Sequence, residues 1–419
     1  MIATMAGLSE ALRAGTWLTR ERGRLVALML LAAALIGVIF VVVTSDGLND
    51  RFGRPLGTDF SNVYAAGTYV LDGNAAAPFD PELQYRREGL IFGPETPFYG
   101  WHYPPFFLGL AAFLALMPYW LALLVWQGTT LAIYLSAMRS ILGKDSALGK
   151  DPLWLVLALA FPAVFINLGH GHNGLLTAAL VAGALIQLDR RPWLSGILIG
   201  LLAYKPQFGL LIPLVLAVSG RWRVFAAAAA TVAVLALAVT LAFGADVWTA
   251  FLASTQFTRT VVLEQGDTGW RKIQSVFSIV RMWGGGIDLA YALQGAVTIA
   301  VAGALVWLWR GRAAFPLKAA ALLIGTVLAT PYVLDYDLML LAPAIAFVTA
   351  DGASRGFSPY EKTALAALWL VPLMARAVAL TTLIPLAVPV MFFTFALLLH
   401  RAMTECGGYV QPAHHLPAE

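Results

Sequence analysis

The residue with the clearest chemical potential is Asp59, which follows Gly57 and Thr58 shortly after the first long apolar run. A carboxylate in this position is suited to act as a general base that removes a proton from a hydroxyl group. It is equally suited to accept backbone hydrogen bonds, as a helix N-cap or in an Asx-turn. The spacing of the neighbouring residues does not decide between these two hypotheses.

A second set of candidate side chains consists of Trp101, His102 and Tyr103, which precede Pro104 and Pro105. The two prolines favour the first turn of a helix. Aromatic residues just before a membrane helix are typical of interfacial anchors. The alternative is that the rings stack on a sugar and that His102 contacts a sugar or a phosphate.

Two histidines, His170 and His172, lie with Asn173 between two apolar runs. Their spacing suggests a metal site, but two imidazoles without a nearby acid are too few ligands. We therefore expect no metal here. Asn173 is placed to cap the following helix, and His172 and Asn173 remain candidates for sugar or acceptor contacts.

Charged residues near apolar sequence form a third group. Lys205 interrupts an apolar stretch and precedes Pro206, which must break or kink the helix. An ionisable residue there is a functional candidate that could bind a lipid phosphate, although it could also snorkel to an interface. Arg271 and Lys272 belong to a basic run at 244–288 that suits an anionic lipid head group.

Two carboxylates, Asp335 and Asp337, follow Thr330 and Pro331 near the end of another apolar run. At helical spacing they point to roughly opposite sides, so at most one of them is expected to face a site. We take Asp335 as the candidate contact.

The composition shows what kind of protein must position these residues. Of the 419 residues, 60% are hydrophobic and 12% are charged, which excludes a soluble domain and predicts an all-α, multi-pass membrane protein. The net charge of +4 comes from Lys and Arg between apolar runs, as expected for membrane orientation and not for nucleic-acid binding.

The distribution of charge predicts the topology of a single integral-membrane domain, 1–419. Four arginines precede the apolar run 25–44, so we expect a retained first helix with a cytoplasmic N-terminus. The following segment, 45–103, holds eight acids and four arginines together with many aromatic residues. It is expected to be a folded extracytoplasmic loop that contains short helices.

The remaining apolar runs bring the prediction to about twelve crossings, with the number of crossings left open in 104–139 and 193–218. The positive-inside rule then places four segments on the outer side, namely 45–103, 169–173, the second large loop 244–288, and 330–337. The candidate spans after the first are 104–138, 152–168, 174–188, 193–218, 222–243, 289–309, 319–334, 338–350, 363–382 and 385–401.

The order of several short motifs resembles glycosyltransferase family 87, a group of polyprenol-phosphate-sugar-dependent enzymes of the GT-C superfamily. The resemblance covers most of the chain. The motifs are Gly57-Thr58-Asp59-Phe60, Tyr64-Ala65-Ala66-Gly67, Tyr103-Pro104-Pro105, Gly171-His172-Asn173-Gly174 and Ala203-Tyr204-Lys205-Pro206.

The resemblance implies that Asp59 is the catalytic base in the first outer loop. It implies transfer of a hexose, with mannose first, from a polyprenyl-phosphate-linked donor to a lipid or glycan acceptor, with inversion, outside the cell membrane. Lys205, Arg271 and Lys272 are then candidates for the donor phosphate. We expect a monomer among membrane lipids, with no cofactor and no metal.

One stretch departs from this family. Members that transfer mannose tend to carry histidine near the outer end of a late span, where this chain has 331–337 without histidine. Two other classes stay open at this stage. A transporter or flippase would explain the intramembrane charges but not the folded outer loop, and in a non-catalytic scaffold the polar residues would be structural.

Overall fold

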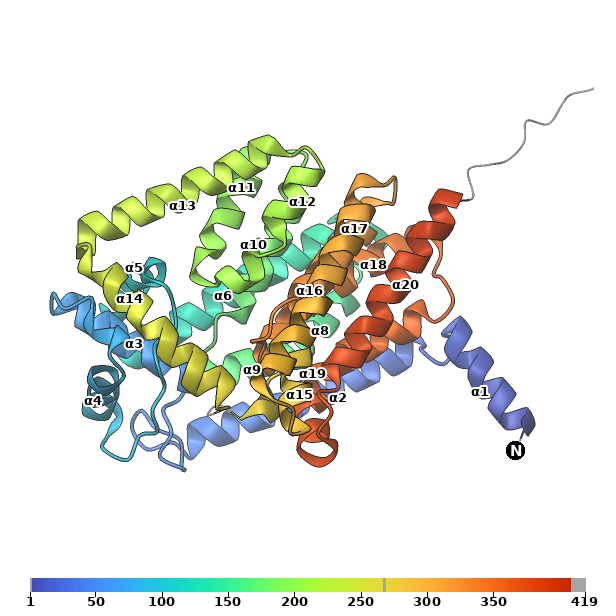
Figure 1. Cartoon of the computed structure of the whole chain (residues 1–419). Coiled ribbons are helices and arrows are strands. Elements are labelled where there is room, and N and C mark those ends of the chain that lie inside the picture. Colours follow the sequence, from blue (N-terminus) through green and yellow to red (C-terminus); the bar gives the residue numbers. More distant parts are fainter. Residues whose placement is uncertain (1, 267–268, 408–419) are drawn as a thin grey trace, which may run out of the picture.

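The computed structural model describes residues 2–266 and 269–407, and every regular element in this part of the chain is a helix. Backbone amides and carbonyls must pair internally in a bilayer, and helices satisfy them within one segment. The fold is therefore the all-α membrane architecture that the composition predicts. Figure 1 shows α3, α4 and α14 gathered at one end of the molecule, away from α20.

The first third of the chain contains one long apolar helix, α2, and then the predicted folded loop. The 45–103 segment does contain short helices, because α3, η1 and α4 all lie within it. The elements are α1 (Ile2–Ala14), α2 (Arg20–Val43), α3 (Thr58–Leu71), η1 (Ala77–Phe79), α4 (Pro81–Phe92), η2 (Pro105–Phe107), α5 (Leu108–Ala115), α6 (Tyr119–Leu142) and α7 (Ala147–Lys150).

In the middle third, prolines break the apolar sequence into shorter helices. The predicted break at Lys205 and Pro206 is present, since two short 3-10 helices meet there. The elements are α8 (Leu153–Leu159), α9 (Pro162–His170), α10 (Gly174–Gln187), α11 (Pro192–Gly200), η3 (Leu201–Tyr204), η4 (Pro206–Gly209), α12 (Ile212–Val218) and α13 (Trp222–Phe243).

The last third begins with an irregular loop and ends in long helices. The elements are α14 (Asp246–Phe257), the π-helix η5 (Thr258–Glu264), η6 (Trp270–Lys272), α15 (Val276–Met282), α16 (Ile287–Arg310), α17 (Phe315–Leu328), η7 (Asp335–Leu340), α18 (Leu341–Arg355), α19 (Glu361–Thr382) and α20 (Ala387–Gly407).

Seven helices in the described residues are long and apolar enough to cross a membrane, or eight if the bent pair α8 and α9 forms one span. Five shorter apolar helices, including Pro105–Ala115 and Phe315–Leu328, lie in other apolar runs but are too short to count as crossings by the same criteria. The apolar helix α2 leaves most of its side chains exposed. An exposed apolar helix suits a lipid environment, so the chain is a multi-pass membrane protein.

Small residues allow some of these helices to approach closely. A Cβ at Gly196 of α11 would lie 2.5 Å from the carbonyl oxygen of Val224 in α13, and one at Gly67 of α3 would lie 2.1 Å from that of Ala111 in α5. Neither position has room for a side chain. Such close backbone contact is typical of membrane helix packing, and it fixes α3, the helix that carries Asp59.

Candidate active site

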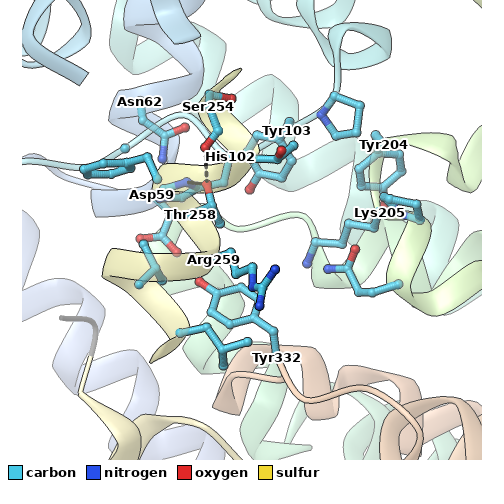
Figure 2. A pocket seen from close by; sticks show the side chains of 18 of the residues that line it. Asp59, Asn62, His102, Tyr103, Tyr204, Lys205, Ser254, Thr258, Arg259 and Tyr332 are labelled. Atoms are coloured by element: carbon cyan, nitrogen blue, oxygen red, sulfur yellow. Dashed lines mark hydrogen bonds between the residues drawn. The ribbon is translucent and has the colours of Figure 1, made fainter. Parts of the chain in front are cut away.

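A cavity of about 500 Å³ lies where segments far apart in the sequence meet. Each of the four segments expected on the outer side contributes to its wall, with residues such as Asp59, His172, Arg259 and Tyr336. Figure 2 shows Asp59 and His102 on one side of the pocket and Tyr204 and Lys205 on the other. The volume is in the usual range for a small-molecule site.

Asp59 is the second residue of α3, and its side chain lies at the cavity wall with 21% of its surface exposed. The N-cap of α3 is Gly57, and the structure shows no side-chain cap hydrogen bond there. The capping hypothesis for Asp59 is therefore wrong. Its carboxylate remains available for chemistry in the cavity.

Two glycines bring the Asp59 motif against the histidine motif. Gly57 and Gly171 both have positive φ, 71° and 62°, which glycine adopts without strain. A Cβ at Gly171 would lie 2.6 Å from the Cβ of Phe60 and 3.4 Å from the Cα of Gly57. The turn after α9 therefore packs directly on the turn before α3.

This packing places His170 beside Asp59. The Nδ1 atom of His170 lies 2.6 Å from Oγ1 of Thr58 and 3.8 Å from Oδ1 of Asp59. Residue spacing does not predict this pair, because the two residues are 111 positions apart and no local pattern links them. His172 stacks on Tyr336, with ring centroids 3.5 Å apart, and the ring of His170 meets the same tyrosine edge to face at 6.1 Å.

The surroundings of Asp59 have opposing effects on its charge. Burial is the largest influence and raises the pKa of the Asp59 carboxyl. The positive charges of His170 and Lys205 oppose this rise. These charges therefore favour the ionised carboxylate.

Lys205 forms a buried ion pair with Asp337. Its Nζ lies 2.6 Å from Oδ1 of Asp337, and the two side chains are only 6% and 3% exposed. The other carboxylate oxygen, Oδ2, accepts a hydrogen bond from the Leu334 amide at 3.0 Å. Lys205 therefore does not snorkel to an interface, and it lines the cavity together with Asp337.

His102 and Tyr103 line the cavity, as expected for contact residues. His102 Nδ1 lies 2.9 Å from Thr258 Oγ1, which links the 98–104 wall to the start of η5. Burial lowers the pKa of the His102 imidazole to about 4, so the ring is neutral near pH 7. It is suited to exchange hydrogen bonds but not to supply charge.

A buried carboxyl group supports the same wall. Glu88 of α4 is fully buried and accepts hydrogen bonds from the Tyr99 amide at 2.9 Å and from Gln84 Nε2 at 3.2 Å. Burial raises the pKa of Glu88 to about 8. Because Tyr99 lines the cavity, Glu88 holds one of its walls in place.

Comparison with known families identifies the family of the chain. The model of glycosyltransferase family 87 matches residues 101–331, more than half of the chain. The chain belongs to glycosyltransferase family 87. Comparisons with curated proteins and with solved structures gave no match.

The family assignment makes this protein a membrane glycosyltransferase, which favours the enzyme hypothesis over the transporter. The matched range includes His102, Tyr103, His172 and Lys205, whereas Asp59 lies before it. Asp59 is linked to the matched range through the contact with His170.

Several expected contacts of the glycosyltransferase lie outside the cavity wall. Trp101 is only 3% exposed and packs in the core, 5.2 Å from the Tyr103 ring. Asn173 occupies the N-cap position of α10, as expected, but its side chain makes no cap hydrogen bond. Neither residue is part of the cavity lining.

The choice between the two late carboxylates also changes. Asp337 lines the cavity, whereas Asp335 does not and accepts a hydrogen bond from the Tyr336 amide at 3.0 Å. As expected, only one of the pair faces the site. Helical spacing sets their relative directions but not the rotation of the segment, so the sequence could not identify which one.

The basic loop supplies a different cation from the two that we expected. Arg271 is exposed, Lys272 is partly buried, and neither lines the cavity. Arg259, on the π-helix η5, does line it, and its Nε donates to Glu264 Oε1 at 2.7 Å. Nothing in the sequence separates Arg259 from the other cations of the loop, because the irregular η5 backbone sets its direction.

Proposed function

We propose that the glycosyltransferase moves a hexose from a polyprenyl-phosphate-linked donor to a hydroxyl group of a lipid or glycan acceptor. One observation carries the proposal: a single cavity of about 500 Å³ has the Asp59 carboxylate and the cations Lys205 and Arg259 in its wall. A base and cations around one cavity are what transfer from a phosphate-linked sugar requires.

The reaction is a single displacement. Asp59 takes the proton of the acceptor hydroxyl as that oxygen bonds to the anomeric carbon. The bond between this carbon and the phosphate oxygen breaks, and polyprenyl phosphate leaves as an anion that keeps the bonding electrons. The leaving group needs cations and no proton. Attack opposite the leaving group inverts the anomeric configuration.

Arg259 is the first candidate for the donor phosphate. The charge of Lys205 is already balanced by Asp337, whereas Arg259 is 66% exposed and shares its partner Glu264 with Tyr291. A guanidinium can bind two phosphate oxygens at once. The phosphate would replace Glu264 as its partner when the donor binds.

The sugar ring would lie among the aromatic residues of the wall. Tyr103, Tyr204 and the stacked pair of His172 and Tyr336 all line the same cavity. The Lys205 and Asp337 pair offers N–H donors and carboxylate acceptors for sugar hydroxyls. Mannose is the first hexose to test.

We place the cavity on the extracytoplasmic face of the cell membrane, with the N-terminus in the cytoplasm. Support comes from three basic connections between helices, 189–191, 221–223 and 309–312, which lie close together. Arg221 pairs with Asp189 at 3.0 Å, and its guanidinium lies 5.4 Å from the Trp309 ring. The positive-inside rule assigns such a cluster to the cytoplasm. One chain supplies the whole cavity, so we propose a monomer.

The test gives purified protein in liposomes one of two donors. One is radiolabelled mannose linked to polyprenyl phosphate, and the other is radiolabelled mannose linked to a nucleotide. Membranes from cells that lack the enzyme provide the acceptor. We expect transfer from the polyprenyl-phosphate donor alone, with an inverted linkage. Transfer from the nucleotide sugar, or a product with retained configuration, would contradict the proposal.

A further inference from the structure

His170 approaches Asp59 from outside the cavity lining. Asp59 belongs to the lining, whereas Thr58 and His170 do not. The imidazole Nδ1 is 3.8 Å from Oδ1 of Asp59, and the His170 side chain is 37% exposed. Asp59 therefore lies between the reaction space and a histidine that remains in contact with solvent.

The position of this histidine is fixed by a set of hydrogen bonds. Thr58 Oγ1 binds the ring at 2.6 Å. Trp126 Nε1 donates to the Gly171 carbonyl at 2.9 Å, and Gln127 Nε2 donates to the Leu168 carbonyl at 2.6 Å. These bonds anchor the end of α9 on both sides of His170. The ring therefore has a defined place beside the carboxylate.

We propose that His170, held by Thr58, is a positioning residue that keeps Asp59 as an ionised carboxylate directed at the cavity. This inference rests on the proposed role of Asp59 as the base. When His170 is protonated, it donates from Nδ1 to Thr58 Oγ1 and places a positive charge next to Asp59. The imidazole acts through Asp59 and does not touch the substrate.

Other charged groups near Asp59 are less suited to keep its carboxylate ionised. Lys205, between η3 and η4, and Lys272 of η6 also lower the pKa of the Asp59 carboxyl, whereas the negative charge of Asp335 in η7 raises it. Lys205 is already paired with Asp337. Among the positive charges that act on Asp59, His170 has the largest effect in lowering the pKa of its carboxyl, which agrees with the short distance between them.

In the described part of the chain, the neighbours of His170 include two further titratable groups and a tyrosine ring. Asp335 and His172 are within electrostatic range, and the Tyr336 ring lies 6.1 Å away, edge to face. Because a base must be ionised to act, the acidic limb of the rate profile reports the protonation of the Asp59 carboxylate. Removing the imidazole must move that limb to higher pH, because the carboxylate loses a favourable charge.

The experiment measures kcat/KM for mannose transfer between pH 5.5 and 9 with His170→Gln, using His400→Gln, an exposed site on α20, as a control. We expect the acidic limb of His170→Gln to move up by about one pH unit, which is about a tenfold loss at acidic pH. The rate at pH 9 should stay within about threefold of the wild type. The control variant should follow the wild-type profile.

Thr58 variants provide the second arm if His170→Gln does not fold. Thr58→Val should shift the limb in the same direction by a smaller amount, and Thr58→Ser should restore the wild-type profile. A uniform loss at all pH values, or no change, would overturn the inference. If Asp59→Asn were fully active, the proposed base itself would fail. If Asp59→Asn were inactive while His170→Gln matched the wild type, only the role of His170 would fail.

Discussion

Buried charges occur near both ends of the Asp335–Arg355 segment. The helical rise separates Asp337 from Asp351 by roughly 20 Å. At one end is the cavity pair, Lys205 and Asp337. At the other is the Arg401 cluster, which consists of Asp351, Arg355, Glu361, Arg401 and Glu405. Both contain ion pairs below 7% exposure, yet their hydrogen bonding differs.

The Arg401 cluster satisfies its own polar groups. Arg401 donates to both oxygens of Glu361, at 2.8 and 2.6 Å, and Arg355 donates to both oxygens of Asp351. Lys205, in contrast, has three N–H donors and, within the described residues, one hydrogen-bond partner. A saturated cluster serves the fold, whereas an unsaturated pair at a cavity wall is suited to bind a ligand.

The largest expected effect breaks the saturated cluster. Arg401→Met leaves buried carboxylates without their central cation, which should cost about 3–5 kcal/mol of unfolding free energy. Transfer per folded molecule should be unchanged. Unfolding measured in lipid checks this, with the exposed Arg310→Met as control. A variant no less stable than the control would show that the cluster has no structural role.

The second prediction concerns the cavity pair. Lys205→Met with Asp337→Asn removes both charges together, so stability should stay within about 1 kcal/mol of the wild type. Transfer should fall about 100-fold, since the sugar loses its charged contacts. Assays on folded protein at equal concentration measure both quantities. Full transfer by this double variant would remove the contrast between the two regions.

Arg259 allows a smaller but more specific test. Arg259→Gln should weaken inhibition by free polyprenyl phosphate about tenfold, because this product carries the phosphate without the sugar. The control is Arg271→Gln, which changes an exposed cation outside the cavity wall. Equal inhibition of both variants would exclude Arg259 from phosphate binding.

The smallest effect concerns Glu88, a buried carboxyl group with no ion-pair partner within the described residues. Its pKa rises from 4.5 to about 8 in the fold, so the folded protein keeps a proton that the unfolded chain releases. Stability of the wild type should therefore fall as pH rises from about 5 to about 8.

Glu88→Gln keeps the acceptor for Tyr99 and has no charge to titrate. The stability of this variant should depend less on pH, and its melting temperature at pH 8 should be higher than that of the wild type by about 2–4 °C. Thermal unfolding at several pH values checks it, with the exposed Glu82→Gln on the same helix as control. An unchanged slope would mean that Glu88 is not the titrating group.

The sequence predicts local features of this fold well. Apolar runs predict the long helices, Pro206 predicts the break beside Lys205, and aromatic content predicts a folded 45–103 segment. The positions of the basic residues also predict that four segments lie on the same side of the membrane, and these four segments meet at the cavity. These features follow from interactions between residues close in sequence, or from how each segment meets the membrane.

The partners within the site could not be predicted in the same way. Lys205 and Asp337 are 132 positions apart, and Thr58 and His170 are 112 apart. Their pairing depends on how α3, α9 and η7 pack, through contacts such as Gly57 against Gly171. The direction of Arg259 depends on the irregular η5. Helix packing and helix rotation are tertiary properties, so residue spacing alone does not specify them.

The most direct test of the account is transfer by Asp59→Asn, which keeps the size of the side chain and removes the base. Purified protein in liposomes would receive labelled polyprenyl-phosphate mannose and the membrane acceptor, with Asp72→Asn, at the C-terminal end of α3, as control. We predict at least a 100-fold loss of transfer for Asp59→Asn, with unchanged binding of polyprenyl phosphate. Transfer at the wild-type rate would contradict the central claim that Asp59 is the catalytic base.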